Sequence, residues 1–240
     1  MGDTPDRLSQ SLDVSHVTIG YSRAEQPVLR DVVFSLHRGS RAALVGPNGC
    51  GKSTLLNAIA GRLPFQAGHI TLLGQPIGDL RSRVASIGAD FDLFEYLTAR
   101  ENARFVLAFM RRPWSADAYD RLERRYGMET FSGMPAGTLS RGTRRKIQLI
   151  TALLIRPALL LADEPLDGLD SASRTHWEED TAALAVEGCI VLSAVHEQTA
   201  YGARTTDVVL EVGNGTVRTG ANVGLTTRPR AAAGRASRPL

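Results

Sequence analysis

The sequence predicts an α/β fold with a mostly parallel sheet, an N-terminal antiparallel β layer and an inserted helical subdomain. Three observations support this prediction. A glycine-rich loop separates a short apolar strand from a helix within residues 41–62. From residue 158 onward strand-like and helical segments alternate, as they do around parallel sheets. Between residues 90 and 155 helical patterns interrupt the alternation, which indicates a helical subdomain inserted into a single core.

The glycine-rich loop has the composition of a phosphate-binding P-loop. Its glycines let the backbone curl so that several N–H groups point at one anion, and the following helix adds its N-terminal partial positive charge. Lys52 supplies a charge for the outer phosphates, and the hydroxyl of Ser53 is a ligand of the kind that Mg²⁺ prefers. The fold class is therefore a P-loop NTPase core. The predicted nucleotide-binding residues here are Gly46, Pro47, Asn48, Gly49, Cys50, Gly51, Lys52, Ser53 and Thr54.

Hydrophobic periodicity locates the remaining elements. Early strands separated by short turns form the predicted antiparallel layer, and the alternating segments of the later half form the parallel sheet. Strands are expected at 11–19, 28–36, 41–45, 69–73, 84–88, 158–162, 189–194, 207–212 and 216–218. Helices are expected at 52–62, 98–110, 116–126, 141–155 and 171–186.

An apolar strand followed by two carboxylates completes the predicted site. The run 159–162 is wholly apolar, which fits a strand buried on both faces of a sheet. Asp163 and Glu164 follow it at the carboxyl edge, where parallel α/β sheets bind their ligands. We expect Asp163 to hold Mg²⁺ through water and Glu164 to polarise an attacking water. An acidic turn is the plain alternative, but phosphoryl transfer needs both this element and the loop.

Composition and charge describe an ordinary globular chain. Apolar residues make up 43% and charged residues 22% of 240 residues, which allows a substantial core. The two cysteines indicate no disulfide framework. The net charge of +3 comes from residues 221–240, because their four arginines leave 24 basic against 25 acidic residues elsewhere. This Arg-rich tail is expected to be disordered, either as a plain solubilising segment or in contact with acidic lipid or nucleic acid.

The chain shows no pattern of membrane insertion. No apolar run is long enough to span a bilayer, and the N-terminus lacks the pattern of a signal peptide. A membrane role would therefore require a partner on another chain.

A third motif lies between the loop and the two carboxylates. Leu139-Ser140-Arg141-Gly142 opens the helix expected at 141–155. The chain thus contains a P-loop, then Leu-Ser-x-Gly, then an apolar strand that ends in Asp-Glu-Pro. In the order of these three motifs it resembles the ATP-binding subunits of ABC transporters. The resemblance covers residues 12 to 220. It implies one ATP-binding domain at 1–220, with a helical subdomain at roughly 90–155 and the tail at 221–240.

The resemblance implies further site residues and the cofactors ATP and Mg²⁺. Tyr21 matches the aromatic residue that stacks on adenine, although a tyrosine packed at a strand end is the simple alternative. Asp170 ends the loop across which two such subunits communicate, and His196 matches the switch histidine that contacts the γ-phosphate. Ser140 and Gly142 would bind the nucleotide that the P-loop of a second subunit holds.

Two departures from the family pattern affect what is implied. The position of the family's glutamine loop falls on Ala89, which can neither ligate Mg²⁺ nor orient water; Asp90 is an adjacent substitute. Arg141 and Thr143 replace the commoner Gly and Gln of the signature, while Gly142 is kept. The aromatic residues within 91–96 would line a groove for a membrane partner or form part of the subdomain core.

The implied function is the ATP-hydrolysing motor subunit of a bacterial ABC transporter. It would dimerise head-to-tail around ATP, with an identical or different second subunit, and drive a separate permease from the cytoplasmic face of the cell membrane. Residues 97–102 and the compact helical subdomain resemble those of exporters; an importer is the alternative. A soluble non-transport ABC ATPase, such as the iron–sulfur assembly type, is a second class, and a small-molecule kinase would not explain Leu-Ser-x-Gly. No specific nucleic acid is expected as a partner.

Overall fold

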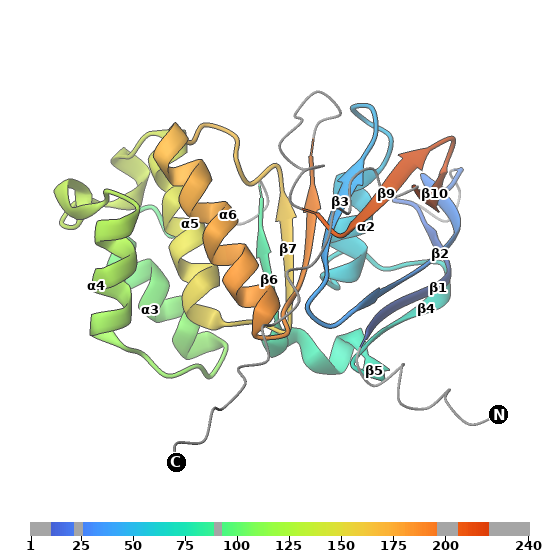
Figure 1. The fold of residues 1–240 in the computed structure, drawn as a ribbon, viewed down its shortest axis with the longest axis horizontal. Helices are drawn as coiled ribbons and strands as arrows, with labels where there is room; N and C mark the ends of the chain where they lie inside the picture. The colour runs from blue at the N-terminus through green and yellow to red at the C-terminus, as the bar shows by residue number, and fades with distance from the viewer. Residues whose placement is uncertain (1–10, 22–25, 89–92, 196–205, 221–240) are drawn as a thin grey trace, which may run out of the picture.

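The computed structural model describes residues 11–21, 26–88, 93–195 and 206–220. Two sheets lie side by side, and most of the helices gather at one end (Figure 1). The predictions for Ala89, Asp90, His196 and the tail at 221–240 lie outside the described residues, as does the first part of the predicted aromatic segment at 91–96.

The antiparallel layer predicted at the N-terminus is confirmed. Its strands pair in the order β2-β1-β4-β5, and every pair is antiparallel. Buried and exposed residues alternate along β2, so one face of this sheet meets the core and the other meets solvent. The strands are β1 (Ser11–Ile19), β2 (Leu29–His37), β4 (Ala67–Leu72) and β5 (Gln75–Pro76).

The second sheet is the mostly parallel core. Its order is β10-β9-β3-β8-β7-β6, with all pairs parallel except that between β9 and β10. β7 is fully buried along its apolar run, as expected for a strand covered on both faces. The strands are β3 (Arg41–Val45), β6 (Val84–Ile87), β7 (Leu159–Asp163), β8 (Ile190–Ala194), β9 (Val208–Gly213) and β10 (Thr216–Thr219).

Two hydrophobic cores flank this second sheet. One lies on the face that carries Leu159 and Leu161, and contains the antiparallel layer and α2. The other lies on the face that carries Leu160 and Ala162, and contains the residues of α3 to α6. The helices are α2 (Lys52–Ile59), α3 (Ala99–Phe109), α4 (Ala116–Arg125), α5 (Arg141–Ile155) and α6 (Ser171–Val186).

The helices of the second core begin at side-chain caps. Thr98 and Glu101 form a capping box at α3, and Ser115, Ser140 and Asp170 each accept a backbone hydrogen bond at the start of α4, α5 and α6. These polar signals explain why the predicted helix starts agree with the structure. The periodicity missed β5 and three short 3-10 helices, η1 (Ile77–Arg83), η2 (Glu129–Phe131) and η3 (Ala136–Thr138).

Candidate nucleotide site

The P-loop follows β3 and opens α2, as predicted. Gly46, Gly49 and Gly51 all have positive φ, at 154°, 77° and 109°. Gly46 also lies against the core sheet: a Cβ there would come within 2.3 Å of the carbonyl oxygen of Val212 in β9. A side chain at this position would push the loop off the sheet, so the tight curl of the backbone depends on glycine.

Lys52 is held at the mouth of the loop although it is only 6% exposed. Its ammonium donates to the carbonyl oxygens of Gly46 at 2.5 Å and Pro47 at 3.1 Å. Pro47, Asn48 and Gly49 are exposed around it, and Cys50 is partly buried as a free thiol. The arrangement keeps one positive charge beside the backbone N–H groups of the loop, which is the chemistry that a phosphate requires.

Tyr21 is tied to the start of α2 by its hydroxyl group. Its oxygen lies 3.0 Å from Oγ1 of Thr54, which is buried one turn into the helix. The tyrosine side chain remains 68% exposed. A ring anchored at one end and open on its face can stack on a base, and the residue is not packed into the core.

Asp163 and Glu164 lie at the carboxyl edge of the core sheet. Asp163 ends β7 opposite Ala194 of β8, and the Glu164 N–H donates to the carbonyl oxygen of Ala194 at 3.1 Å. Glu164 has φ of 47°, a left-handed conformation that is costly for a residue with a side chain. Such strain is found at functional sites, because the surrounding structure must hold it in place.

A small polar cavity separates Asp163 from α2. Its volume is about 20 Å³, and Asn57, Ser86 and Gly88 contribute to its wall. That is room for a single water molecule beside the carboxylate. Ser53 is exposed at the start of α2, so one hydroxyl and one carboxylate are available as oxygen ligands. This donor set suits Mg²⁺, which is commonly held by one or two carboxylates together with substrate phosphates and water.

The Leu-Ser-x-Gly motif forms the start of α5. The Ser140 hydroxyl caps the helix by accepting from the Thr143 N–H at 3.2 Å. Gly142 packs directly on a second loop, since a Cβ on it would lie 2.2 Å from the carbonyl oxygen of Gly168. Arg141 reaches the same loop through an ion pair with Asp167 at 2.9 Å. The motif and the loop at 167–170 therefore form one continuous surface.

Asp170 has a structural role as well as its predicted nucleotide role. One carboxylate oxygen accepts from the Ser173 N–H at 2.8 Å and caps α6, while the other pairs with Lys146 of α5 at 2.6 Å. The same ammonium donates to the carbonyl oxygen of Tyr126 at the end of α4. The hydrogen bond from Lys146, followed by the backbone bond from Ser173, holds the pKa of Asp170 well below its usual range.

A buried arginine under the carboxylate edge was missed by the sequence analysis. Arg145 is 6% exposed, and it donates to the side-chain oxygen of Gln148 at 2.9 Å. Gln148 in turn donates to the carbonyl oxygen of Gly88 at 3.3 Å. Burial lowers the pKa of Arg145, and the nearby charges of Asp167 and then Asp163 act in the opposite direction. Residues 144–146 are all basic, so the sequence does not indicate which of their side chains is buried.

The predicted nucleotide-binding residues do not all lie at one site within a single chain. Lys52 and α2 belong to the core on one face of the sheet, whereas α5 with Ser140 and Gly142 covers the other face (Figure 1). The residues at 46–54 and the pair Asp163 and Glu164 lie at the same carboxyl edge of the core sheet, after β3 and β7, which are separated by β8.

We predict that Gly142→Ala destabilises the protein by about 1–3 kcal/mol, because its methyl group overlaps the Gly168 carbonyl and forces the helix and loop apart. Alanine favours a helix over glycine by about 1 kcal/mol, so a net loss identifies the close contact. Urea unfolding measures the change. Gly133→Ala is the control, since its Cβ meets nothing within 4 Å; equal effects of the two changes would contradict the prediction.

A pH dependence follows from the pair of Asp170 and Lys146. Because the folded-state pKa of Asp170 is depressed, its charged form stabilises the fold above the ordinary aspartate pKa, and this stability is lost as the pH falls toward the folded value. Asp170→Asn keeps a cap for Ser173 but removes the charge. At pH 7 the wild type should be more stable by less than about 1 kcal/mol, since the carboxylate is half exposed.

The difference in unfolding free energy between wild type and Asp170→Asn should shrink below about pH 4, where the unfolded state takes up a proton. Chemical denaturation at several pH values measures it. A difference that stays constant from pH 7 to pH 3 would show that the ion pair contributes nothing.

Comparison with known proteins identifies the family. A family model described as ABC transporter matches residues 29–167. The chain is 30% identical over 200 residues to "Cytochrome c biogenesis ATP-binding export protein CcmA 2" of Cupriavidus metallidurans, covering 82% of this chain and 95% of that protein. It is 31% identical over 169 residues to "Taurine import ATP-binding protein TauB" of Escherichia coli O157:H7, covering 70% and 66%.

A solved structure agrees with these matches. The structure titled "Structure of ATP binding subunit of ABC transporter" superposes with a TM-score of 0.78 at 32% identity, covering 87% of this chain and 89% of that chain. ATP-binding cassettes of this kind hydrolyse ATP. The chain thus belongs to the ABC transporter family and is one of its ATP-binding subunits, an ATPase.

Proposed function

We propose that this chain is the motor subunit of a bacterial ABC exporter, converting ATP hydrolysis into movement of a separate permease. The observation that supports it most is the shared carboxyl edge of the core sheet, where the P-loop follows β3 and the carboxylates follow β7, with β8 between the two strands. Lys52 binds the outer phosphates, and Ser53 and Asp163 hold Mg²⁺. The metal would offset charge on the transferring phosphoryl group. Glu164 orients the attacking water, with His196 as the γ-phosphate contact.

ATPase domains of this family dimerise and pair with membrane permeases. In the proposed head-to-tail dimer, Ser140 and Gly142 of one subunit bind the nucleotide held by Lys52 of the other. Their place on the opposite face of the sheet from α2 supports this, because a second copy would supply what one chain keeps apart. We assign residues 1–220 to one ATP-binding domain, 90–155 to its helical subdomain and 221–240 to the tail.

The permease contact is proposed at a groove beside the helical subdomain. Its volume is about 460 Å³, its lining is mainly apolar, and α3, α5, β6 and η1 contribute to it. Phe109 lines it and is 81% exposed, whereas Tyr96 of the predicted segment 91–96, 93% exposed, is not one of its lining residues. A short helix of the permease, with an apolar face, fits these dimensions. Within the described residues no helix is both long and apolar enough to cross a membrane.

Export is proposed because, within the described residues 93–140, only two α-helices precede α5 in the helical subdomain, the compact form expected of exporters. The CcmA relative is named as an export protein, while the TauB relative is named as an import protein. Transport in the opposite direction would leave the ATPase chemistry unchanged. The proposed location is the cytoplasmic side of the cell membrane, where ATP is available.

Glu164→Gln should reduce ATP turnover at least about 100-fold while leaving ATP binding intact, because the amide cannot accept the water's proton. Steady-state hydrolysis and nucleotide binding, measured with the permease present, give the two values. Glu129→Gln, an exposed change in η2, is the matched control and should retain activity. Turnover that survives Glu164→Gln would remove Glu164 from the proposed mechanism.

Affinity purification of the Glu164→Gln chain from gently solubilised host membranes should yield an integral membrane protein in equal amount. The double variant that combines Glu164→Gln with Phe109→Glu should lose this co-purification, because a carboxylate would be buried against the permease helix. Val186→Glu, at an equally exposed position on α6, should not. A soluble partner, or none, would favour a non-transport ABC ATPase and overturn the transporter proposal.

A further inference from the structure

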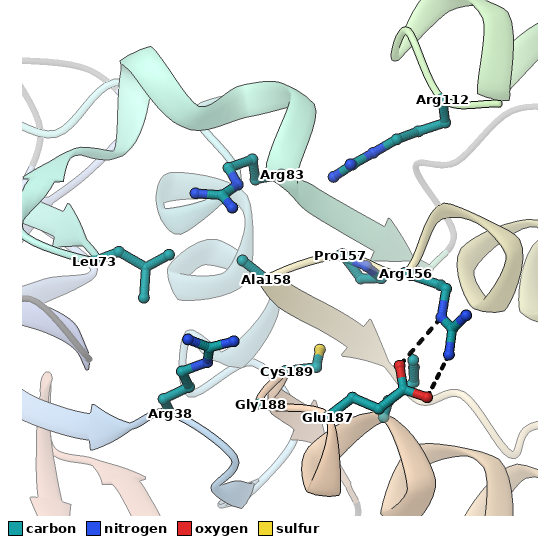
Figure 2. A pocket seen from close by; sticks show the side chains of 11 residues that line it. Arg38, Leu73, Arg83, Arg112, Arg156, Pro157, Ala158, Glu187, Gly188 and Cys189 are labelled. Atoms are coloured by element: carbon teal, nitrogen blue, oxygen red, sulfur yellow. Dashed lines mark hydrogen bonds and ion pairs between the residues drawn. The ribbon is translucent and has the colours of Figure 1, made fainter.

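A second cavity lies at the edge of the core sheet opposite the P-loop. Its volume is about 180 Å³, and it is formed where β6, β7 and β8 begin. Four arginines and one carboxylate line it (Figure 2). They come from separate parts of the fold, namely Arg38 from the β2–β3 turn, Arg83 from the end of η1, Arg112 from the segment after α3, Arg156 from the end of α5 and Glu187 from the end of α6.

Among the residues that the structure describes, only one of the four arginines has a carboxylate partner. Arg156 makes two contacts with the carboxylate of Glu187, one of them at 3.1 Å. Arg38 and Arg83 make no side-chain hydrogen bond or ion pair with any residue that the structure describes. Figure 2 shows the side chains of Arg38 and Arg112 extending toward the part of the cavity occupied by Arg83, whose guanidinium is turned toward the side of Leu73.

Arg112 adds an unsatisfied donor to this cavity. One of its terminal nitrogens donates to the carbonyl oxygen of Ser82 at 3.3 Å. Its Nε is buried and has no hydrogen-bond partner among the described residues. A buried N–H without a partner is unfavourable, as is the gathering of three unpaired positive charges around one space. An anion in the cavity would relieve both costs at once.

The backbone around the cavity makes room for these side chains. Gly188 has φ of 98°, and a Cβ on it would lie 2.3 Å from Nε of Arg38, so the guanidinium lies across the bare backbone. Cys189 forms part of the wall. Burial raises the pKa of its thiol to about 12, which leaves it neutral at ordinary pH and unable to balance the arginines.

The size of the cavity limits its ligand. A volume of about 180 Å³ corresponds to roughly six water molecules. It is smaller than the roughly 300–1,000 Å³ of sites for drug-sized ligands. Arginine offers planar, paired donors that match the oxygens of a phosphate group. One or two phosphoryl groups satisfy both the volume and the donors.

We propose that this cavity is a second anion site, which binds a phosphate or diphosphate group independently of the P-loop. The group belongs either to a free phosphate or diphosphate or to the headgroup of an acidic lipid. Its occupant would join the antiparallel layer through Arg38, the core sheet through Arg83 and the helical subdomain through Arg112. Bound anion therefore favours one arrangement of these three parts.

The test measures diphosphate binding to the full chain by titration calorimetry without Mg²⁺. A Lys52→Ala background weakens binding at the P-loop, which would otherwise obscure the second site. In this background one diphosphate per chain should bind. Arg83→Gln and Arg38→Gln should each weaken that binding about tenfold, because each removes a charged hydrogen-bond donor. Arg121→Gln, an exposed arginine of α4, is the control and should change it less than about twofold.

Circular dichroism melting confirms that each variant is folded, and the two arginine variants serve as independent checks. Sedimentation with phosphatidic acid vesicles, compared with phosphatidylcholine vesicles, separates the two sources of the phosphate. Arg83-dependent binding to the acidic vesicles identifies a lipid headgroup, and binding of free diphosphate alone identifies a soluble anion. The proposal would be overturned if neither diphosphate nor acidic vesicles bound. It would also be overturned if Arg38→Gln and Arg83→Gln left the binding unchanged.

Discussion

Burial of α2 between the two sheets is the interaction on which the rest of the structure depends. This helix packs against β1 on one side and against β7 and β8 on the other. Leu55 and Ile59 are fully buried there, and each contributes roughly 1.5–3 kcal/mol. Because α2 begins at Lys52, this apolar contact fixes the position of Lys52 at the carboxyl edge of the core sheet. The phosphate chemistry thus relies mainly on apolar packing.

The helical side of the sheet is assembled by different forces. Gly142 and Gly168 meet backbone to backbone, and Lys146 connects the ends of α4, α5 and α6 through Tyr126 and Asp170. Such polar junctions are sensitive to geometry, whereas an apolar core tolerates small changes of shape. The P-loop therefore rests on apolar packing, whereas the surface proposed to face a second subunit is set by a few close backbone and polar contacts.

Much of this arrangement was predictable from sequence because the signals are local. The phosphate loop, the apolar run ending at Asp163 and the capping residues Ser140 and Asp170 all act on neighbours within a few positions. Contacts between distant segments had no such signal. The approach of Gly142 to Gly168 and the inward turn of Arg145 depend on how α5 lies on the sheet. Hydrophobic periodicity cannot indicate which of three adjacent basic residues is buried. The 3-10 helix η1 is too short to show a hydrophobic periodicity.

Helix α5 connects the Leu-Ser-x-Gly motif to the groove beside the helical subdomain. Its 15 residues form a rod of about 22 Å, with Ser140 at one end and Ile155, a wall residue of the groove, at the other. Gln148, which also lines the groove, holds Gly88 near its middle. The surface proposed to face a second subunit and the groove proposed to face a permease are therefore carried by one helix, so a displacement of either end of α5 involves both surfaces.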